Sequence, residues 1–173
     1  MPNRAVTNFM RQQGFGEEPL DACAMHFEGL YFQPRIVFPA VIVAILLQIA
    51  SIPASAGLHF AISAVLWWNT ALPARNPFEL VYNHWIARPR ERLELVPAPG
   101  PRRMAQGMAA AFNLGAFLAL VYGMTPLAWM LQAMLVAAFS ALLFGRFCLG
   151  AYVFHILKGR AAFANSTLPW ARG

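Results

Sequence analysis

Hydrophobic residues along this chain gather into four long runs, and polar residues fill the stretches between them. The runs cover residues 34–52, 54–72, 104–124 and 126–145. A helix of roughly 20 residues, rising about 1.5 Å per residue, matches a hydrocarbon core about 30 Å thick. The alternation of apolar and polar residues that is typical of strands is absent from all four runs. The pattern predicts an all-α membrane protein in which four transmembrane helices form two hairpins.

Charged residues predict how these helices are oriented in the membrane. They lie outside the runs, apart from Arg35 at the first boundary, and the two links inside the hairpins carry no charge. Arginines crowd instead into the central link, residues 73–103, and basic residues recur in the tail, residues 158–173. Because positively charged loops stay in the cytoplasm, both termini and the central link are expected there. The expected order is a cytoplasmic N-terminal arm over residues 1–33, a transmembrane domain over 34–157 and a basic cytoplasmic tail.

The central link contains the pattern of a short helix. Asn76 can cap the N-terminus of this helix, and Pro77 suits its first position. Glu79 lies in the first turn, where the helix dipole favours a negative charge. One face of this helix is apolar and consists of Phe78, Val81, Tyr82, Trp85 and Ile86. We expect the helix to lie in the cytoplasmic interface and to bind anionic phospholipid, the alternative being a loop whose aromatic residues cover the bundle end. The residues expected at the interface are Trp85, Arg88, Arg90, Arg92, Arg146, Lys158 and Arg160.

Small residues recur at every fourth position in the third and fourth runs. The third run carries Gly107, Ala111, Gly115, Ala119 and Gly123. The fourth run carries Ala133, Ala137, Ala141 and Gly145. Close approach of helix backbones at small residues is a main source of helix association in lipid, so these two stripes are expected to pack against each other. The first run is bulky and aliphatic all round, which suits contact with lipid or with a partner protein.

Composition excludes several classes of protein. Charged residues make up 12% of the chain, against about 25% in a soluble domain, and 59% of the residues are hydrophobic. The net charge of +6 is not arranged as a nucleic-acid surface, and no nucleic-acid partner is expected. Transport of ions or protons is also disfavoured, because the polar residues expected inside the bundle include no acid. These residues are Gln48, His59, Ser63, Asn69, Asn113, Gln132 and Ser140.

Two histidines are candidate ligands of a cofactor. His59 is expected near the outer end of the second helix and His155 near the cytoplasmic end of the fourth, so they cannot share one metal. Each could bind haem or a bacteriochlorophyll axially, but the favoured role is a hydrogen bond to a neighbouring helix. Cys23 and His26 lack further donors for a metal site, and no disulfide with Cys148 is expected in the reducing cytoplasm. No cofactor or metal is therefore predicted.

The second half of the chain resembles a known family. The stretches "PRRMAQG" and "GMTPLAWMLQAMLVAAFSALLFGRFCLGAYVF" resemble a bacterial four-span integral-membrane family of unknown function, over roughly residues 34–157. Members typically have an Arg/Pro-rich central link and end the last helix in a Phe-Cys-Leu-Gly-Cys-like motif. The resemblance implies the same topology in a bacterial inner membrane and brings no activity. This chain reads FCLGA, so the family's cysteine pair would fall on Cys148 and on position 151, where this chain has Ala151. Cys148 therefore lacks the second, resolving thiol that two-cysteine redox chemistry needs.

These features favour a non-enzymatic membrane protein that serves as an accessory or stabilising subunit of a larger membrane complex. Other membrane subunits are its expected partners. One alternative is a cofactor-binding subunit of an electron-transfer or photosynthetic assembly, with His59 or His155 as the axial ligand. A second alternative is a membrane thiol oxidoreductase, against which the missing second cysteine argues.

Overall fold

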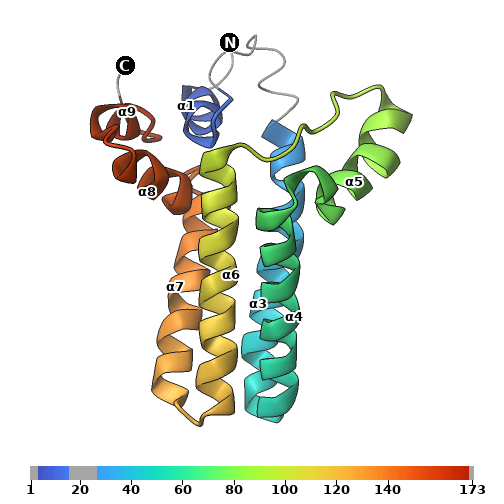
Figure 1. Ribbon diagram of the computed structural model, residues 1–173, viewed down its shortest axis with the longest axis vertical. Coiled ribbons are helices and arrows are strands. Elements are labelled where there is room, and N and C mark those ends of the chain that lie inside the picture. Colours follow the sequence, from blue (N-terminus) through green and yellow to red (C-terminus); the bar gives the residue numbers. More distant parts are fainter. Residues whose placement is uncertain (1–3, 16–26, 172–173) are drawn as a thin grey trace.

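Four long antiparallel helices form a stem in the computed structural model, which describes residues 4–15 and 27–171 (Figure 1). They are α3 (Phe32–Ala50), α4 (Ile52–Ala71), α6 (Gly100–Val121) and α7 (Thr125–Leu143). The tight turns of both hairpins lie together at one end of the stem, the hairpin end. One helix lies over each of the four apolar runs, and the part of the chain that the structure describes contains no strand. The prediction of an all-α fold is confirmed.

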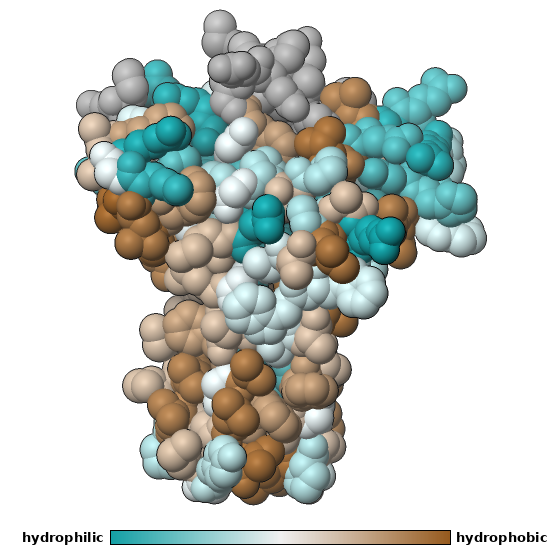
Figure 2. Space-filling view, in the orientation of Figure 1, coloured by the Kyte–Doolittle hydropathy of each residue, from teal (hydrophilic) through white to brown (hydrophobic). Residues whose placement is uncertain are grey.

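The opposite end of the stem carries a wider head built from shorter elements (Figure 1). The head consists of α1 (Arg4–Gln13), α5 (Pro77–Tyr82), α8 (Leu149–Leu157), α9 (Ala161–Ser166) and the short turns Pro73–Arg75, Asn83–Ala87 and Arg88–Arg90. Residues 73–99 extend sideways from the stem and form what we call the side arm. All charged side chains of the described residues lie in the head or in the helix ends beside it, and Figure 2 shows the hydrophilic surface gathered there.

Three helices are long and apolar enough to cross a membrane, namely Phe27–Ala50, α6 and α7. The first of them begins one turn before α3. α4 has a matching length of 20 residues, and its polar residues Ser55, His59, Ser63 and Asn69 lie on its buried side. Large apolar side chains are exposed along all four stem helices, and a surface of this kind suits contact with lipid. The structure is thus compatible with a membrane protein.

Polar side chains set the ends of two helices. Ser51 Oγ accepts a hydrogen bond from the N–H of Ala54 at 3.3 Å and caps α4. Asn76 Oδ1 accepts the N–H of Phe78 at 3.0 Å, which confirms the cap predicted for the helix in the central link.

The apolar face predicted for that helix is split in the structure. Tyr82 is buried, whereas Val81 and Trp85 are exposed. Regular α-helix ends at Tyr82, and the following turn, Asn83–Ala87, is wider than an α-helical one. A wider turn changes the angle between successive side chains, so residues spaced for one helical face no longer share it. The predicted short helix is thus present over Pro77–Tyr82 and continues as a wider turn to Ala87, but its predicted apolar residues do not share one face.

α6 and α7 pack against each other, but only part of the two predicted small-residue stripes lies at their contact. Ala111, Ala133 and Ala137 are exposed, and Gly123 lies in the hairpin turn with a φ of +70°. Gly145 lies beyond the end of α7, where an added Cβ would meet only its own preceding turn. A repeat of four residues advances by about 40° around a helix at each step, so such a stripe winds away from any one neighbour.

The remaining small residues contact several neighbours. Gly115 lies against Leu131 of α7, and Gly107 lies against Thr70 of α4. Ala119 is fully buried at the hairpin end, and Ala141 is half-buried. The most extensive contact between stem helices joins α4 to α6, not α6 to α7.

The last stem helix ends earlier than predicted, at Leu143. In the turn that follows, Arg146 has a left-handed backbone with a φ of +52°, and α8 then runs in a new direction (Figure 1). His155 therefore lies on a separate short helix, which corrects its predicted place near the end of the fourth transmembrane helix. Arg146 is half-buried with its guanidinium carbon 5.6 Å from the centroid of the Phe27 ring. It packs within the head.

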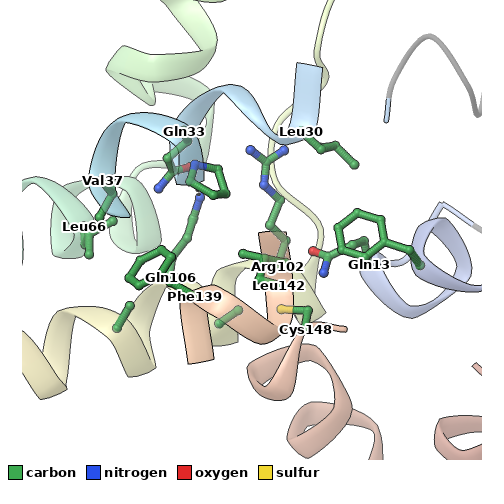
Figure 3. Close-up of a pocket in the computed structure, with 14 residues that line it drawn as sticks. Gln13, Leu30, Gln33, Val37, Leu66, Arg102, Gln106, Phe139, Leu142 and Cys148 are labelled. Atoms are coloured by element: carbon green, nitrogen blue, oxygen red, sulfur yellow. Dashed lines mark hydrogen bonds between the residues drawn. The ribbon is translucent and has the colours of Figure 1, made fainter. Parts of the chain in front are cut away.

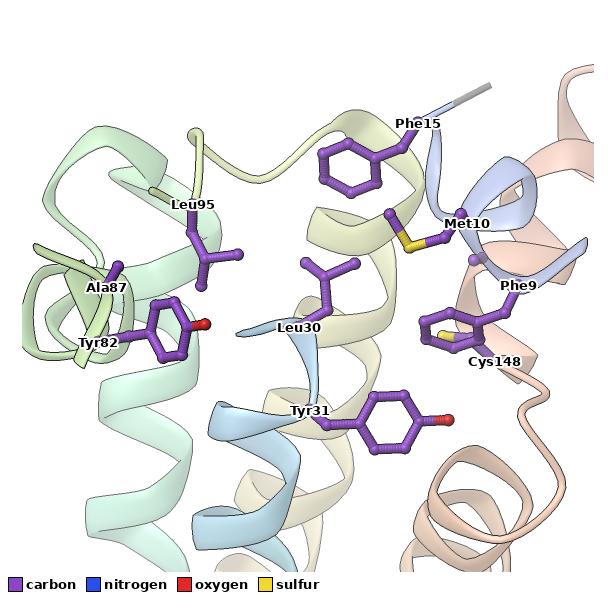
Figure 4. Close-up of a cluster of buried hydrophobic side chains, with 10 residues drawn as sticks. Phe9, Met10, Phe15, Leu30, Tyr31, Tyr82, Ala87, Leu95 and Cys148 are labelled. Carbon is purple, nitrogen blue, oxygen red and sulfur yellow. The ribbon is translucent and has the colours of Figure 1, made fainter. Parts of the chain in front are cut away.

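A hydrophobic core of buried side chains holds the head together (Figure 4). It joins Phe9 and Met10 of α1, Leu30 and Tyr31 at the start of the first long helix, Tyr82, Ala87 and Leu95 of the side arm, and Cys148 and Ala151 at α8. Tyr31 donates its hydroxyl to the carbonyl oxygen of Leu142 at 2.8 Å, which fixes the top of α3 to the end of α7. The head is thus a packed unit in which segments far apart in the sequence meet.

Candidate functional site

A buried ion pair joins the side arm to the stem. Arg102 in the first turn of α6 and Glu79 in α5 are 6% and 5% exposed, and Arg102 Nη1 lies 3.4 Å from Glu79 Oε1. Burial raises the pKa of the Glu79 carboxyl, while Arg102 and the Asn76 side chain act to lower it. Because each buried charge costs several kcal/mol unless it is paired, this contact determines how the side arm sits on α6.

A cavity of about 70 Å³ lies at the junction of head and stem, next to Arg102 (Figure 3). Its polar lining comes from Gln13, Gln33, Arg102, Gln106 and the thiol of Cys148, and the rest of the wall is apolar. Gln106 Nε2 donates to Gln33 Oε1 at 2.8 Å, which links α6 to α3. The cavity has room for a few water-sized groups and offers them hydrogen bonds. Its one cation is already paired with Glu79.

Cys148 lies in this wall at the N-terminus of α8. Its backbone N–H donates to Gln12 Oε1 of α1 at 2.9 Å, and the residue is 5% exposed. Burial raises the pKa of the Cys148 thiol, and the smaller effects of Gln13 and Arg102 act in the opposite direction. The thiolate is the reactive form of cysteine, so a buried thiol with a raised pKa packs as a small apolar group. Cys23 lies outside the described residues.

We expect Cys148 to react slowly with maleimide in the folded protein. In a Cys23→Ser background, labelling should be slow at neutral pH and should keep increasing with pH beyond about 8.5, the pKa of an ordinary thiol, because the thiolate forms only at higher pH. A matched control is Ala162→Cys, introduced at an exposed position of α9 in a chain that lacks both native cysteines. Cys148 labelling as fast as that of the control would contradict the buried position.

His155 is enclosed by the head. Its Nε2 lies 3.0 Å from the carbonyl oxygen of Gln12, and its ring packs against Phe163 of α9 at 4.8 Å between centroids. A carbonyl oxygen only accepts, so Nε2 carries the proton and donates. The imidazole therefore joins α8 to α1, and protein surrounds it with 4% of the residue exposed.

His59 lies in a hydrogen-bond network that connects all four stem helices. Gln132 Nε2 of α7 donates to Gln48 Oε1 of α3 at 2.8 Å and lies 3.1 Å from His59 Nε2. His59 Nδ1 lies 2.9 Å from Asn113 Oδ1 of α6, and Asn113 Nδ2 donates to the Ala109 carbonyl. Since the Gln132 amide nitrogen can only donate, His59 Nε2 accepts and Nδ1–H donates to Asn113. Both ring nitrogens of a neutral imidazole are thus engaged with protein.

Most of the polar residues predicted inside the bundle are buried there. Gln48, His59, Ser63, Asn69, Asn113 and Gln132 are at most 8% exposed, and Ser140 is half-buried. Ser63 Oγ donates to the Ala110 carbonyl at 2.9 Å, and Ser55 Oγ donates to the Ala44 carbonyl at 2.7 Å. Within the described residues, no three His, Cys, Asp or Glu side chains gather where they could hold a metal ion. His26 lies outside those residues.

The other residues predicted at the membrane interface lie on the surface of the head. Trp85 is 71% exposed, and the predicted cations other than Arg146 are exposed as well: Arg88, Arg90, Arg92, Lys158 and Arg160. Arg88 Nε donates to Glu94 Oε1 at 2.9 Å, so this cation is paired within the side arm. Arg90 and Arg92 also lie on the side arm, and neither forms an ion pair with another of the described residues.

Several residues of the junction were missed from the sequence. Arg102 was assigned to the charged link, although α6 begins at Gly100 and buries it. Glu79 is predicted from the sequence only as an acid in a first helical turn, not as a buried partner of Arg102. One signal was available, because Glu79 is the only acidic residue between Glu28 and Glu91, in an otherwise apolar or basic region. Gln13, Gln33 and Gln106 carried no comparable signal.

Comparison with known proteins places the chain in a family. No curated protein and no solved structure matches it. The family model described as Domain of unknown function (DUF4395) matches residues 29–158, which include the whole stem, the side arm and α8. This match agrees with the resemblance to a family of unknown function. The chain therefore belongs to the DUF4395 family.

Proposed function

We propose that this protein is a four-span protein of the bacterial inner membrane that acts as an accessory or stabilising subunit of a larger membrane complex, without chemistry of its own. In this proposal α4 is the fourth span, and the head, with both chain termini, lies in the cytoplasm. The arginines of the head support that orientation through the positive-inside rule. The length of α4 and its position along α6 support its role as a span.

The observation that carries the proposal is the asymmetry between the two ends of the stem. The hairpin end consists of two short uncharged turns, whereas the head is a packed unit held by the Glu79–Arg102 pair, the contacts of Gln12 with α8, and a hydrogen bond from Asn8 to the Leu168 carbonyl at 2.9 Å. A fixed surface on one side of a membrane is suited to hold a partner in a defined position. Among the described residues, the exposed charges of this head and of the helix ends beside it are nine cations and three carboxylates.

The stem interior supports the non-enzymatic part of the proposal. Neutral amides and an imidazole bond to each other across the helices there, and a chain of ionisable groups, as in a proton or ion path, is not formed by the described residues. Cys148 is buried with a raised thiol pKa, which disfavours thiol exchange.

Site-specific photocrosslinking in cells tests the proposal. A photoreactive amino acid at Arg90 or Arg160 of the head should give a discrete adduct with another protein, and one at Tyr122 of the hairpin end, which is 73% exposed, should not. Loss of this chain should lower the abundance of the captured protein, because accessory subunits stabilise their complexes. Absence of any adduct from the head, or an unchanged abundance of the captured protein, would count against a subunit role.

A further inference from the structure

A groove of about 570 Å³ lies between the outer face of α4 and the base of the side arm. Ala64, Val65 and Trp68 of α4 form one wall, and Arg75, Pro77 and Leu80 form the other. Val65, Trp68 and Leu80 are 38%, 54% and 55% exposed, so the groove opens outward and not into the stem.

The position of the groove is that of the membrane interface. Trp67 and Trp68 lie exposed in the last turns of α4, and Trp85 lies exposed on the side arm. Exposed tryptophans concentrate at the boundary between hydrocarbon and head groups. Toward the hairpin end, the groove face of α4 continues with exposed Ala61 and Gly57. The groove thus begins in the hydrocarbon and ends at the level of the head groups.

Arg75 supplies the one ionisable side chain of the groove. It is exposed, and no ion pair joins it to another of the described residues. The Trp68 indole N–H donates to the Arg75 carbonyl at 3.0 Å, which holds the Arg75 backbone against the last turns of α4. An apolar groove with a cation at its polar end, held there through its backbone, matches a molecule with a long apolar part and a terminal anion.

We propose that this groove binds one anionic phospholipid, whose acyl chain lies along α4 and whose phosphate pairs with Arg75. Shape favours this occupant over a partner helix. The side arm projects sideways across the head end of the groove, where a straight transmembrane helix would meet Pro77 and Leu80 (Figure 1). A phospholipid has its head group at that level and fits beneath the overhang. The proposal rests on the membrane placement of the stem, but not on a role as a subunit.

Native mass spectrometry of the full chain in mild detergent, with added phosphatidylglycerol or phosphatidylcholine, tests the site. The wild-type protein should retain one phosphatidylglycerol in preference to phosphatidylcholine. Arg75→Gln should weaken this retention about tenfold, because a charge-assisted contact to phosphate is lost. Arg4→Gln removes the same charge from an exposed position on α1, outside the groove and the predicted interface residues, and should bind like wild type.

A second pair of variants tests the apolar part of the groove. Ala64→Phe should fill the groove and also release the lipid, although Arg75 is intact. Ala133→Phe, at an exposed position of α7, should leave binding unchanged. Equal retention by Arg75→Gln and Arg4→Gln, or equal binding of the two lipids, would mean a diffuse charge attraction and would overturn the site.

Carbonate extraction separates this proposal from the proposed membrane placement. A chain released from membranes without detergent would overturn both. The chain could instead stay in the membrane while a photoreactive residue at Val65 captures a protein in place of lipid. That result would overturn the lipid site alone.

Discussion

Gly150→Ala is expected to destabilise the protein by about 2 to 3 kcal/mol, because α8 approaches α6 too closely at this residue to admit a side chain. An added Cβ at Gly150 would lie 2.7 Å from the Cβ of Ala105 and 3.0 Å from its backbone nitrogen. These atoms belong to the short side chain and backbone of a helix, so they cannot rotate away as the end of a long side chain could. Relief requires α8 to move off α6, which would disturb the wall of the cavity at Cys148.

The matched control for this variant is Gly57→Ala. Gly57 lies within α4 and has no atom within 4 Å of an added Cβ. Alanine is the better helix former, so Gly57→Ala should be neutral or more stable by roughly 0.5 to 1 kcal/mol. Thermal unfolding of both variants in one detergent makes the comparison. A melting temperature for Gly150→Ala equal to that of Gly57→Ala would show that α8 is not held against α6 as described.

The long helices could be predicted from the sequence because the bilayer imposes a simple requirement. A segment that crosses hydrocarbon must satisfy its backbone within a helix and must be apolar over about 20 residues. The burial of Gln48, His59 and Gln132 followed from the same requirement, since polar side chains in such helices turn toward the bundle. The Asn76 cap was predictable because it depends on neighbouring residues alone.

Helix packing could not be predicted in the same way. The sequence shows which residues are small and how they are spaced, but it does not show which side of a helix faces which neighbouring helix. Gly107 faces α4, Gly115 faces α7 and Ala111 is exposed, although all three belong to one stripe. The glycine that permits the closest approach among the described helices is Gly150, in a short helix that the sequence pattern merged with the fourth span.

The junction of head and stem was missed because it is made by long-range pairs. Gln106 and Gln33 lie 73 residues apart, and Cys148 and Gln12 lie 136 residues apart. A single arginine or glutamine in a polar link has the same local pattern whether it is solvated or buried. Only the three-dimensional arrangement brings Arg102 to Glu79 and removes both from water.

The second large effect is expected at this ion pair. Glu79→Leu leaves the Arg102 guanidinium buried without a counter-charge, and a loss of about 3 to 5 kcal/mol is expected. Arginine keeps its proton in proteins, so Arg102 cannot escape the penalty by becoming neutral. Arg102→Met should be less damaging, because the remaining carboxyl can take up a proton. Glu94→Leu breaks a shorter contact, 2.9 Å to Arg88, but both side chains are exposed, so little change is expected.

The pH dependence of the Arg102→Met variant distinguishes a buried carboxyl from a solvated one. Burial already raises the pKa of Glu79, and removal of Arg102, which lowers it, should raise that pKa further. A carboxyl whose pKa is higher in the folded state than in the unfolded state binds its proton more tightly when folded. The variant should therefore be most stable below about pH 4.3, the pKa of an unfolded glutamate, and should lose stability as pH rises through the folded value.

The double variant Glu79→Leu/Arg102→Met completes the test of the pair. It leaves no buried charge, so it should recover most of the stability that Glu79→Leu loses. Denaturation of the wild type and the three variants in one detergent gives the coupling between the two residues. If the double variant were as unstable as Glu79→Leu, the loss would come from packing of the α5 helix and not from an unpaired charge. Recovery, in contrast, would mean that Glu79 is needed chiefly because Arg102 is buried beside it.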